Sequence, residues 1–86
     1  MIKEIQIIPV KQNKGLVAFC TFTLFDCIYC SSVAIYTRPD GGYRLVYPTK
    51  KIGDKNINIF YPINKKMGQV LEKKIALKAN EILKLF

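Results

Sequence analysis

The sequence contains no histidine, and only six of its 86 residues are acidic. Histidine is the commonest general base and metal ligand in proteins, so its absence removes the usual form of both roles. The three aspartates, Asp26, Asp40 and Asp54, lie at or beside predicted turns, and the glutamates are scattered without pairing. No glycine-rich phosphate loop is present either. We therefore predict that the protein is not an enzyme, uses no cofactor and has no small-molecule substrate.

Cysteine is also scarce, with Cys20, Cys27 and Cys30 as the only three. An odd, small number without a secretory signal favours reduced thiols and a cytoplasmic location. Cys27 and Cys30 form a Cys-x-x-Cys pair, but a structural zinc site needs four ligands, and only Cys20 remains. We expect the cysteines to be buried small hydrophobic side chains and no metal to be bound. A metal shared across a dimer is the less favoured alternative.

Long apolar stretches are missing as well. No apolar run approaches the roughly 18 residues of a membrane-spanning helix, and residues 2–10 are too short and too interrupted for a signal peptide. Half of the residues are nevertheless hydrophobic, which is too many for a disordered chain. The sequence thus predicts a single domain over residues 1–86 and no membrane partner. Because so short a chain has a thin stability margin, we expect it to pair as a homodimer.

Apolar and β-branched residues predict five strands within residues 2–60. The strands cover residues 2–10, 17–25, 27–37, 43–47 and 56–60. Pro9 cannot donate a ladder hydrogen bond, so it indicates an edge strand or a bulge. Residues 38–42 read Arg-Pro-Asp-Gly-Gly, which is typical of a hairpin turn. The short connections predict a mostly antiparallel sheet.

The last third of the chain changes to a helical period. Asn64 is the expected N-cap of a helix over residues 64–85. A stripe at helical spacing, predicted to face the sheet, consists of Leu71, Ile75, Ala79, Ile82 and Phe86. A second apolar strip, suited to a partner, consists of Met67, Val70, Leu77 and Leu85. The predicted fold is α+β: a five-stranded, mostly antiparallel sheet followed by one C-terminal helix.

Positive charge is concentrated in the second half of the chain. The net charge is +8; residues 1–49 hold five basic and three acidic side chains, and residues 50–86 hold nine lysines and three acidic side chains. Such a concentration favours a polyanionic partner. Lys50, Lys51 and Lys55 surround a Gly-Asp turn between two Tyr-Pro pairs. Lysine suits phosphate as a mobile point charge, although lysines can also simply protect sheet edges from aggregation.

The order of these motifs has a counterpart in a known family. The matching features are Ile5 onward as the first strand, Asp26-Cys27, Gly41-Gly42, Tyr47-Pro48-Thr49-Lys50-Lys51 and Tyr61-Pro62-Ile63-Asn64. Over nearly its whole length the chain resembles the SpoVG family of bacterial septation and stage V sporulation regulators. Where this chain has Tyr47-Pro48-Thr49-Lys50-Lys51, the family usually carries Met-Pro-Ser followed by two basic residues. Where it has Tyr61-Pro62-Ile63-Asn64, the family usually carries His-Pro-Ile-Asn.

The resemblance implies a small dimeric β-sheet protein with a C-terminal helix that binds DNA, and in some members RNA, as a regulator. Family members act in septum formation, sporulation, and envelope or virulence gene control. Carried over by position, Lys50 and Lys51 are implied to bind nucleic acid. The chain departs from the family at Asn58, where a basic residue is usual, and at Tyr61, where histidine is usual.

We expect Lys50, Lys51 and Lys55 to contact phosphates. Lys65 and Lys66 extend the positive surface at the helix start, where a phosphate would offset their opposition to the helix dipole. Lysine contacts position a protein without reading sequence. Specificity would therefore come from Arg44, Asn56, Asn58 or DNA shape.

Two other functions compete with this reading. Single-stranded RNA binding needs exposed aromatic side chains for base stacking. Its candidates are Tyr29, Tyr36, Tyr43 and Tyr47, although packing is the favoured role of each. A protein-interaction adaptor would instead act through a sheet edge or the second helix strip, without nucleic-acid binding.

Overall fold

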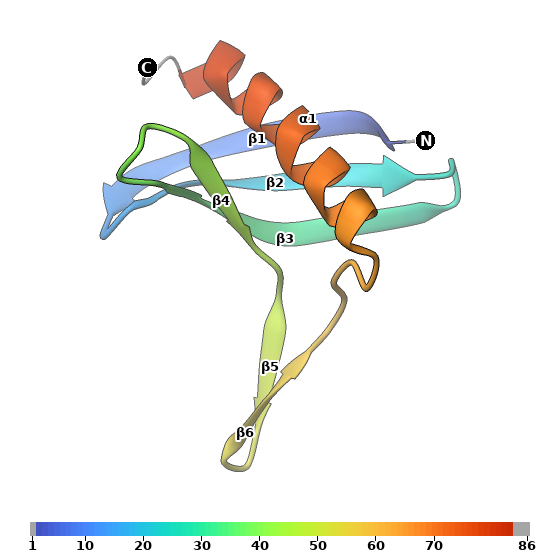
Figure 1. Cartoon of the computed structure of the whole chain (residues 1–86). Coiled ribbons are helices and arrows are strands. Elements are labelled where there is room, and N and C mark those ends of the chain that lie inside the picture. Colours follow the sequence, from blue (N-terminus) through green and yellow to red (C-terminus); the bar gives the residue numbers. More distant parts are fainter. Residues whose placement is uncertain (1, 84–86) are drawn as a thin grey trace.

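The computed structural model describes residues 2–83 and confirms the α+β class (Figure 1). Its elements are β1 (Ile2–Asn13), β2 (Leu16–Leu24), β3 (Ile28–Thr37), β4 (Tyr43–Val46), β5 (Thr49–Ile52), β6 (Lys55–Asn58) and α1 (Lys65–Leu83). The first four strands form one antiparallel sheet in the order β1-β2-β3-β4. The last two form a separate antiparallel ribbon.

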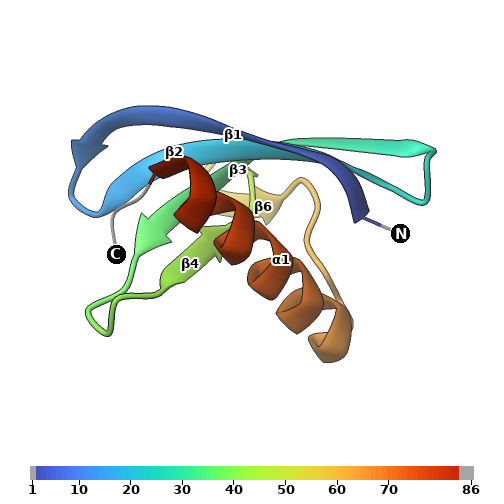
Figure 2. The ribbon, with the colours of Figure 1, turned by 90° about the horizontal axis from the view of Figure 1, so that it is seen from above.

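The helix packs across one face of the four-stranded sheet (Figure 2). Its Leu71, Ile75 and Ala79 are buried, which confirms the first three positions of the predicted stripe. Ile82 is 47% exposed, while Leu83 packs against the core in its place. The helix rotates by about 100° per residue, so the position four after Ala79 returns to the sheet better than the position three after it. Leu85 and Phe86 lie outside the described residues.

Local signals in the sheet behave as predicted. β1 is an edge strand, and its register against β2 shifts just after Pro9. The turn between β3 and β4 is closed by the Gly41 N–H, which donates to the Arg38 carbonyl oxygen at 3.0 Å. Asp40 Oδ1 accepts a hydrogen bond from the Gly42 N–H, also at 3.0 Å. The Arg38 guanidinium donates to Glu72 Oε1 at 2.6 Å and thereby ties the turn to the helix.

The prediction of a five-stranded sheet is wrong. The chain leaves the sheet after β4, where Pro48 has no N–H to continue the ladder. Residues 55–58 then pair with residues 49–52 instead of with the sheet. The reversal is a two-residue loop with Gly53 at φ 61° in its first position, an arrangement favoured in hairpins because it follows the twist of the strands. The predicted basic loop is therefore a hairpin in its own right.

Candidate nucleic-acid interface

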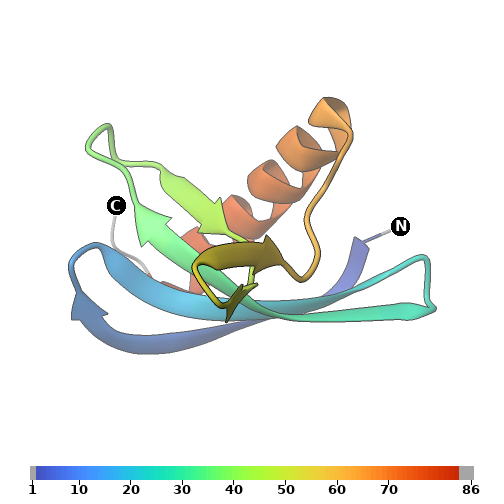
Figure 3. The same cartoon turned by 90° about the horizontal axis from the view of Figure 1, so that it is seen from below.

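The β5–β6 ribbon projects from the body of the protein (Figure 1) and lies in front of the sheet when the molecule is seen from below (Figure 3). All eight of its strand residues are exposed. Its register pairs Lys50 with Ile57 and Ile52 with Lys55. Because side chains alternate along a strand, these four residues share one face of the ribbon. Both faces are therefore open to a ligand.

The structure brings Lys50, Lys51 and Lys55 together on this ribbon, as the sequence predicted. Lys50 and Lys55 lie on one face, one on each strand, and Lys51 lies on the opposite face. Within residues 2–83, none of these lysines forms an ion pair with a carboxylate. The ammonium groups thus remain available to an external anion.

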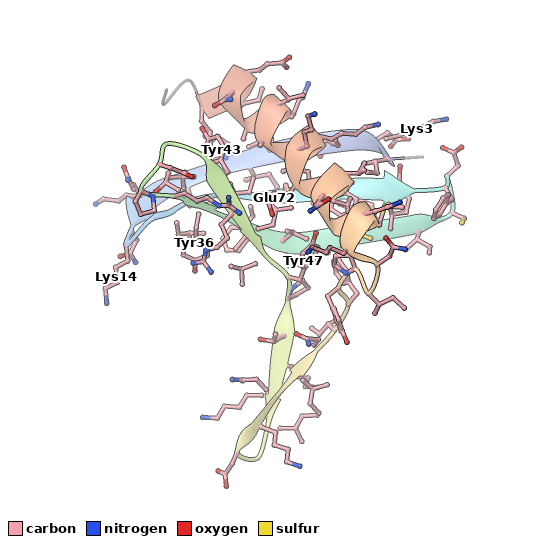
Figure 4. The ribbon with its side chains drawn as sticks, in the orientation of Figure 1. Lys3, Lys14, Tyr36, Tyr43, Tyr47 and Glu72 are labelled. Atoms are coloured by element: carbon pink, nitrogen blue, oxygen red, sulfur yellow. The ribbon has the colours of Figure 1, made fainter. Side chains whose placement is uncertain are left out.

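The base of the ribbon is held to the body by its backbone and by two aromatic rings. The Ile59 N–H donates to the Pro48 carbonyl oxygen at 2.9 Å, which extends the pairing toward the body. The rings of Tyr47 and Phe60 meet edge to face with centroids 6.0 Å apart. Figure 4 shows Tyr47 where the sheet, the helix start and the ribbon meet. The contact between Tyr47 and Phe60, which the sequence did not predict, thus holds the ribbon at its base in addition to the flanking prolines.

Burial, together with the smaller effects of the nearby Cys20, Glu72 and Cys30, raises the pKa of Tyr47 to about 12. The phenol is therefore protonated in the folded protein at all ordinary pH values. Because the pKa is raised above its unfolded value of about 10, the stabilisation is complete below that pH and is lost as the pH rises through about 12. The clamp at the ribbon base is thus insensitive to pH in the physiological range.

Lys65 and Lys66 lie in the first turn of α1, not on the ribbon. Asn64 caps the helix as predicted, since its Oδ1 accepts a hydrogen bond from the Met67 N–H at 3.0 Å. The first turn contains no acidic residue, so the two lysines add to the positive end of the helix dipole. Only residues 59–64 separate them from the ribbon, which places them on the body beside its base (Figure 1).

A cavity that the sequence analysis missed lies next to the ribbon base. It has a volume of about 270 Å³ and a largely apolar wall. Its wall comes from three places: the end of the β2–β3 hairpin, the Tyr47–Phe60 contact and the helix start with Met67 and Leu71. Two of the side chains that line it are largely exposed, Tyr29 at 69% and Tyr61 at 52%. No local pattern could have revealed it, because its walls are far apart in sequence.

The β2–β3 turn beside this cavity has an unusual backbone. Phe25 and Asp26 have φ values of 52° and 57°, and the Cys27 N–H donates to the Leu24 carbonyl oxygen at 3.0 Å. This is the pattern of a type I′ turn, which normally holds Asn-Gly. A bulky residue in the left-handed region costs about 1–2 kcal/mol. The chain thus accepts strain to hold the Phe25 side chain outside the sheet, where it is 58% exposed.

The three cysteines do not share one environment. Cys20 and Cys30 are buried as predicted, but the prediction is wrong for Cys27, which is exposed in the turn before β3. Cys27 lies in the turn that precedes β3, which begins at Ile28, so its side chain is not on the sheet face that the helix covers. In the part of the chain that the structure describes, no three His, Cys, Asp or Glu side chains come together as a metal site.

Thiol labelling should therefore modify one cysteine of the native protein. Burial raises the pKa of Cys20 to about 12 and also raises that of Cys30, so neither forms the reactive thiolate near pH 8. We expect rapid addition of one maleimide at Cys27, measured by mass spectrometry, and three additions in denaturant. Equal rates at two or three sites in native buffer would show that the buried thiols are accessible.

The tyrosines proposed for base stacking are mostly engaged in the fold. Tyr43 is 3% exposed, and Tyr47 belongs to the clamp. Tyr36 lies under the Arg44 guanidinium at 5.2 Å from the ring centroid. Tyr29 alone of these four is largely exposed. The four do not form a stacking platform like those of single-strand binders.

The fold defines a class: a four-stranded antiparallel sheet with one helix on a single face and a projecting basic hairpin. No protein-family model and no curated protein sequence matches the chain. Within residues 2–83, no helix is both long and apolar enough to cross a membrane.

Proposed function

We propose that this protein is a non-catalytic, cytoplasmic regulator that binds DNA, and RNA as a second ligand, through Lys50, Lys51, Lys55, Lys65 and Lys66. One observation carries the proposal: three exposed lysines without ion pairs lie on a hairpin that projects from the body. Septation, sporulation or envelope gene expression, as implied by the resemblance to the SpoVG family, is the proposed field of action.

The charge around the ribbon supports a phosphate ligand. Residues 49–66 contain five lysines and one aspartate, a local balance of +4. Phosphate contacts supply most of the sequence-independent affinity of nucleic-acid-binding proteins. The lysines could instead only protect the edges of the ribbon from aggregation. In that case the protein would bind a polyanion no more strongly than any other basic protein does.

We further propose that two copies pair through the cavity beside the ribbon base. Leu24 is part of the cavity wall, and the next residue, Phe25, is 58% exposed in the β2–β3 turn. A two-fold interface uses one patch twice, so each Phe25 can enter the cavity of the other copy.

The salt dependence of binding tests the proposal. A dimer presents six ribbon lysines, and each phosphate contact contributes roughly −0.9 to the slope of log affinity against log salt. We expect a slope of roughly −5 in mobility-shift titrations of the wild-type protein with a random-sequence duplex. A slope near zero, or no retention of duplex or single strand at about 0.05 M salt, would contradict nucleic-acid binding.

A protein-interaction adaptor is the second candidate, and the exposed strip of the helix favours it. Val70 is 36% and Leu77 is 61% exposed, although both are apolar. Under this function, Val70→Asp or Leu77→Asp should abolish activity in cells, while glutamate at positions 50 and 51 should leave it intact. The DNA-binding function predicts the reverse, so a complementation assay with the two sets of variants decides between them.

A further inference from the structure

The two faces of the β5–β6 ribbon differ in chemistry. One face presents Lys50, Ile52, Lys55 and Ile57. The other presents Thr49, Lys51, Asn56 and Asn58, so that every side chain on it can form hydrogen bonds. All eight residues are exposed. The second set is called the polar face below.

Polar side chains on a protruding ribbon are positioned to read base edges. Asparagine can donate to adenine N7 and accept from its N6 amino group at the same time. The polar face therefore holds two groups suited to adenine, Asn56 and Asn58. Lys51 beside them has a longer, mobile side chain, which can reach past the base edges to a phosphate. Neither asparagine side chain has a hydrogen-bond partner within residues 2–83.

The dimensions of the ribbon match the major groove of duplex DNA. Two strands about 4.8 Å apart fit a groove about 12 Å wide. Four residues extend about 13 Å, the length of about four base pairs. The ribbon stands clear of the sheet and the helix, so no other element blocks its entry (Figure 1). The deep, narrow major groove of an RNA duplex would not admit it.

We propose that the polar face of the β5–β6 ribbon lies on base edges in the major groove of duplex DNA, with Asn56 and Asn58 as the specificity-determining residues. The inference rests on the DNA-binding function proposed above. It deepens that function by separating the residues that hold the duplex from those that read it.

The opposite face explains why this orientation is favoured. With the polar face toward the bases, Lys50 on β5 and Lys55 on β6 lie at the outer level of the ribbon. There, each lysine faces the phosphates of a different DNA strand along the two rims of the groove. In the reverse orientation, Ile52 and Ile57 would meet the base edges without forming hydrogen bonds, and the two asparagines would face solvent.

Selection from a random duplex pool tests the inference. The protein is the full chain, and the probe is a pool of duplexes with a randomised central segment. We expect the wild type to enrich a sequence containing adenine, and to prefer it over the unselected pool by at least about tenfold. Asn56→Ala with Asn58→Ala should reduce that preference about tenfold or more. The salt slope on the unselected pool should stay the same.

The matched control changes the other face. Ile52→Ala with Ile57→Ala should keep the selected sequence and its preference. Replacing the selected adenines by 7-deazaadenine, which lacks the N7 acceptor, should reduce wild-type preference to the level of the asparagine variant.

The outcomes separate the two proposals. If the wild-type protein does not bind the pool, the DNA-binding function itself is wrong. Binding without enrichment, or enrichment that survives the asparagine changes, overturns only the assignment of the polar face. Loss of preference in the isoleucine variant alone would show that the opposite face reads the bases.

Discussion

Replacing Lys50 and Lys51 together by alanine should weaken binding to a random-sequence duplex by about three orders of magnitude near 0.1 M salt. In the proposed dimer the two changes remove four phosphate contacts, each worth roughly −0.9 in the slope of log affinity against log salt. The slope should therefore fall from roughly −5 to roughly −2, with Lys55 of each copy remaining. Fluorescence anisotropy at several salt concentrations measures both quantities.

Lys11 and Lys14 provide the matched control. Both are exposed, and their replacement by alanine changes the net charge by the same amount. Lys14 lies at the β1–β2 turn, away from the ribbon (Figure 4). This control should lose much less affinity and keep nearly all of the slope. An equal loss in both variants would mean that affinity follows total charge, and the ribbon would have no special part in it.

The ribbon variant should also fold normally, which distinguishes lost contacts from lost structure. Lys50 and Lys51 are exposed and form no ion pair among residues 2–83. Exposed substitutions of this kind usually change the free energy of unfolding by no more than about 0.5 kcal/mol. Circular dichroism and a urea titration of both variants should therefore match those of the wild type.

The elements that sequence predicted well are those determined by local signals. Asn64 marks the helix start because its side chain can satisfy a free N–H of the first turn, and it does so at Met67. The Arg-Pro-Asp-Gly-Gly turn joins β3 to β4 because proline and glycine suit its backbone angles. The helical period likewise placed Leu71, Ile75 and Ala79 on the sheet. Each of these features depends on a few neighbouring residues.

The features that sequence missed depend on pairing and packing at a distance. Residues 49–52 lack the apolar alternation of a strand because both faces of the ribbon are in solvent. Their strand character comes only from pairing with residues 55–58. The cavity likewise forms where the β2–β3 turn meets Phe60 and the helix start. The left-handed backbone at Phe25 could not be anticipated either, since a bulky residue is unfavourable there.

Phe25, the residue in this unfavourable conformation, is proposed to enter the cavity of the partner copy. Phe25→Asn should weaken dimerisation by about a thousandfold. A central aromatic residue of an interface typically contributes about 2 kcal/mol or more, and the two-fold symmetry counts the loss twice. Asparagine is well tolerated in the left-handed region and suits the first central position of a type I′ turn. Sedimentation velocity over a range of protein concentrations measures the change.

The same variant should not unfold the monomer. Phe25 is 58% exposed, so the free energy of unfolding at low concentration should stay within about 0.5 kcal/mol of the wild-type value or rise as turn strain is relieved. A buried phenylalanine such as Phe22, at 1% exposure, would instead cost about 3–5 kcal/mol on truncation. With only three ribbon lysines per binding unit, the salt slope on DNA should fall to roughly −3.

Ile8→Asn tests whether the open face of the sheet, instead of the cavity, joins the two copies. Ile8 is 50% exposed on β1, and its pairing with Phe19 places it on the sheet face opposite the helix. If that open face joined the two copies, Ile8→Asn would dissociate the dimer and Phe25→Asn would not. The cavity interface requires the reverse. A wild-type protein that stays monomeric at high concentration would contradict the proposed dimer. The salt slope of the wild type would then be roughly −3, because each molecule would contribute only three ribbon lysines.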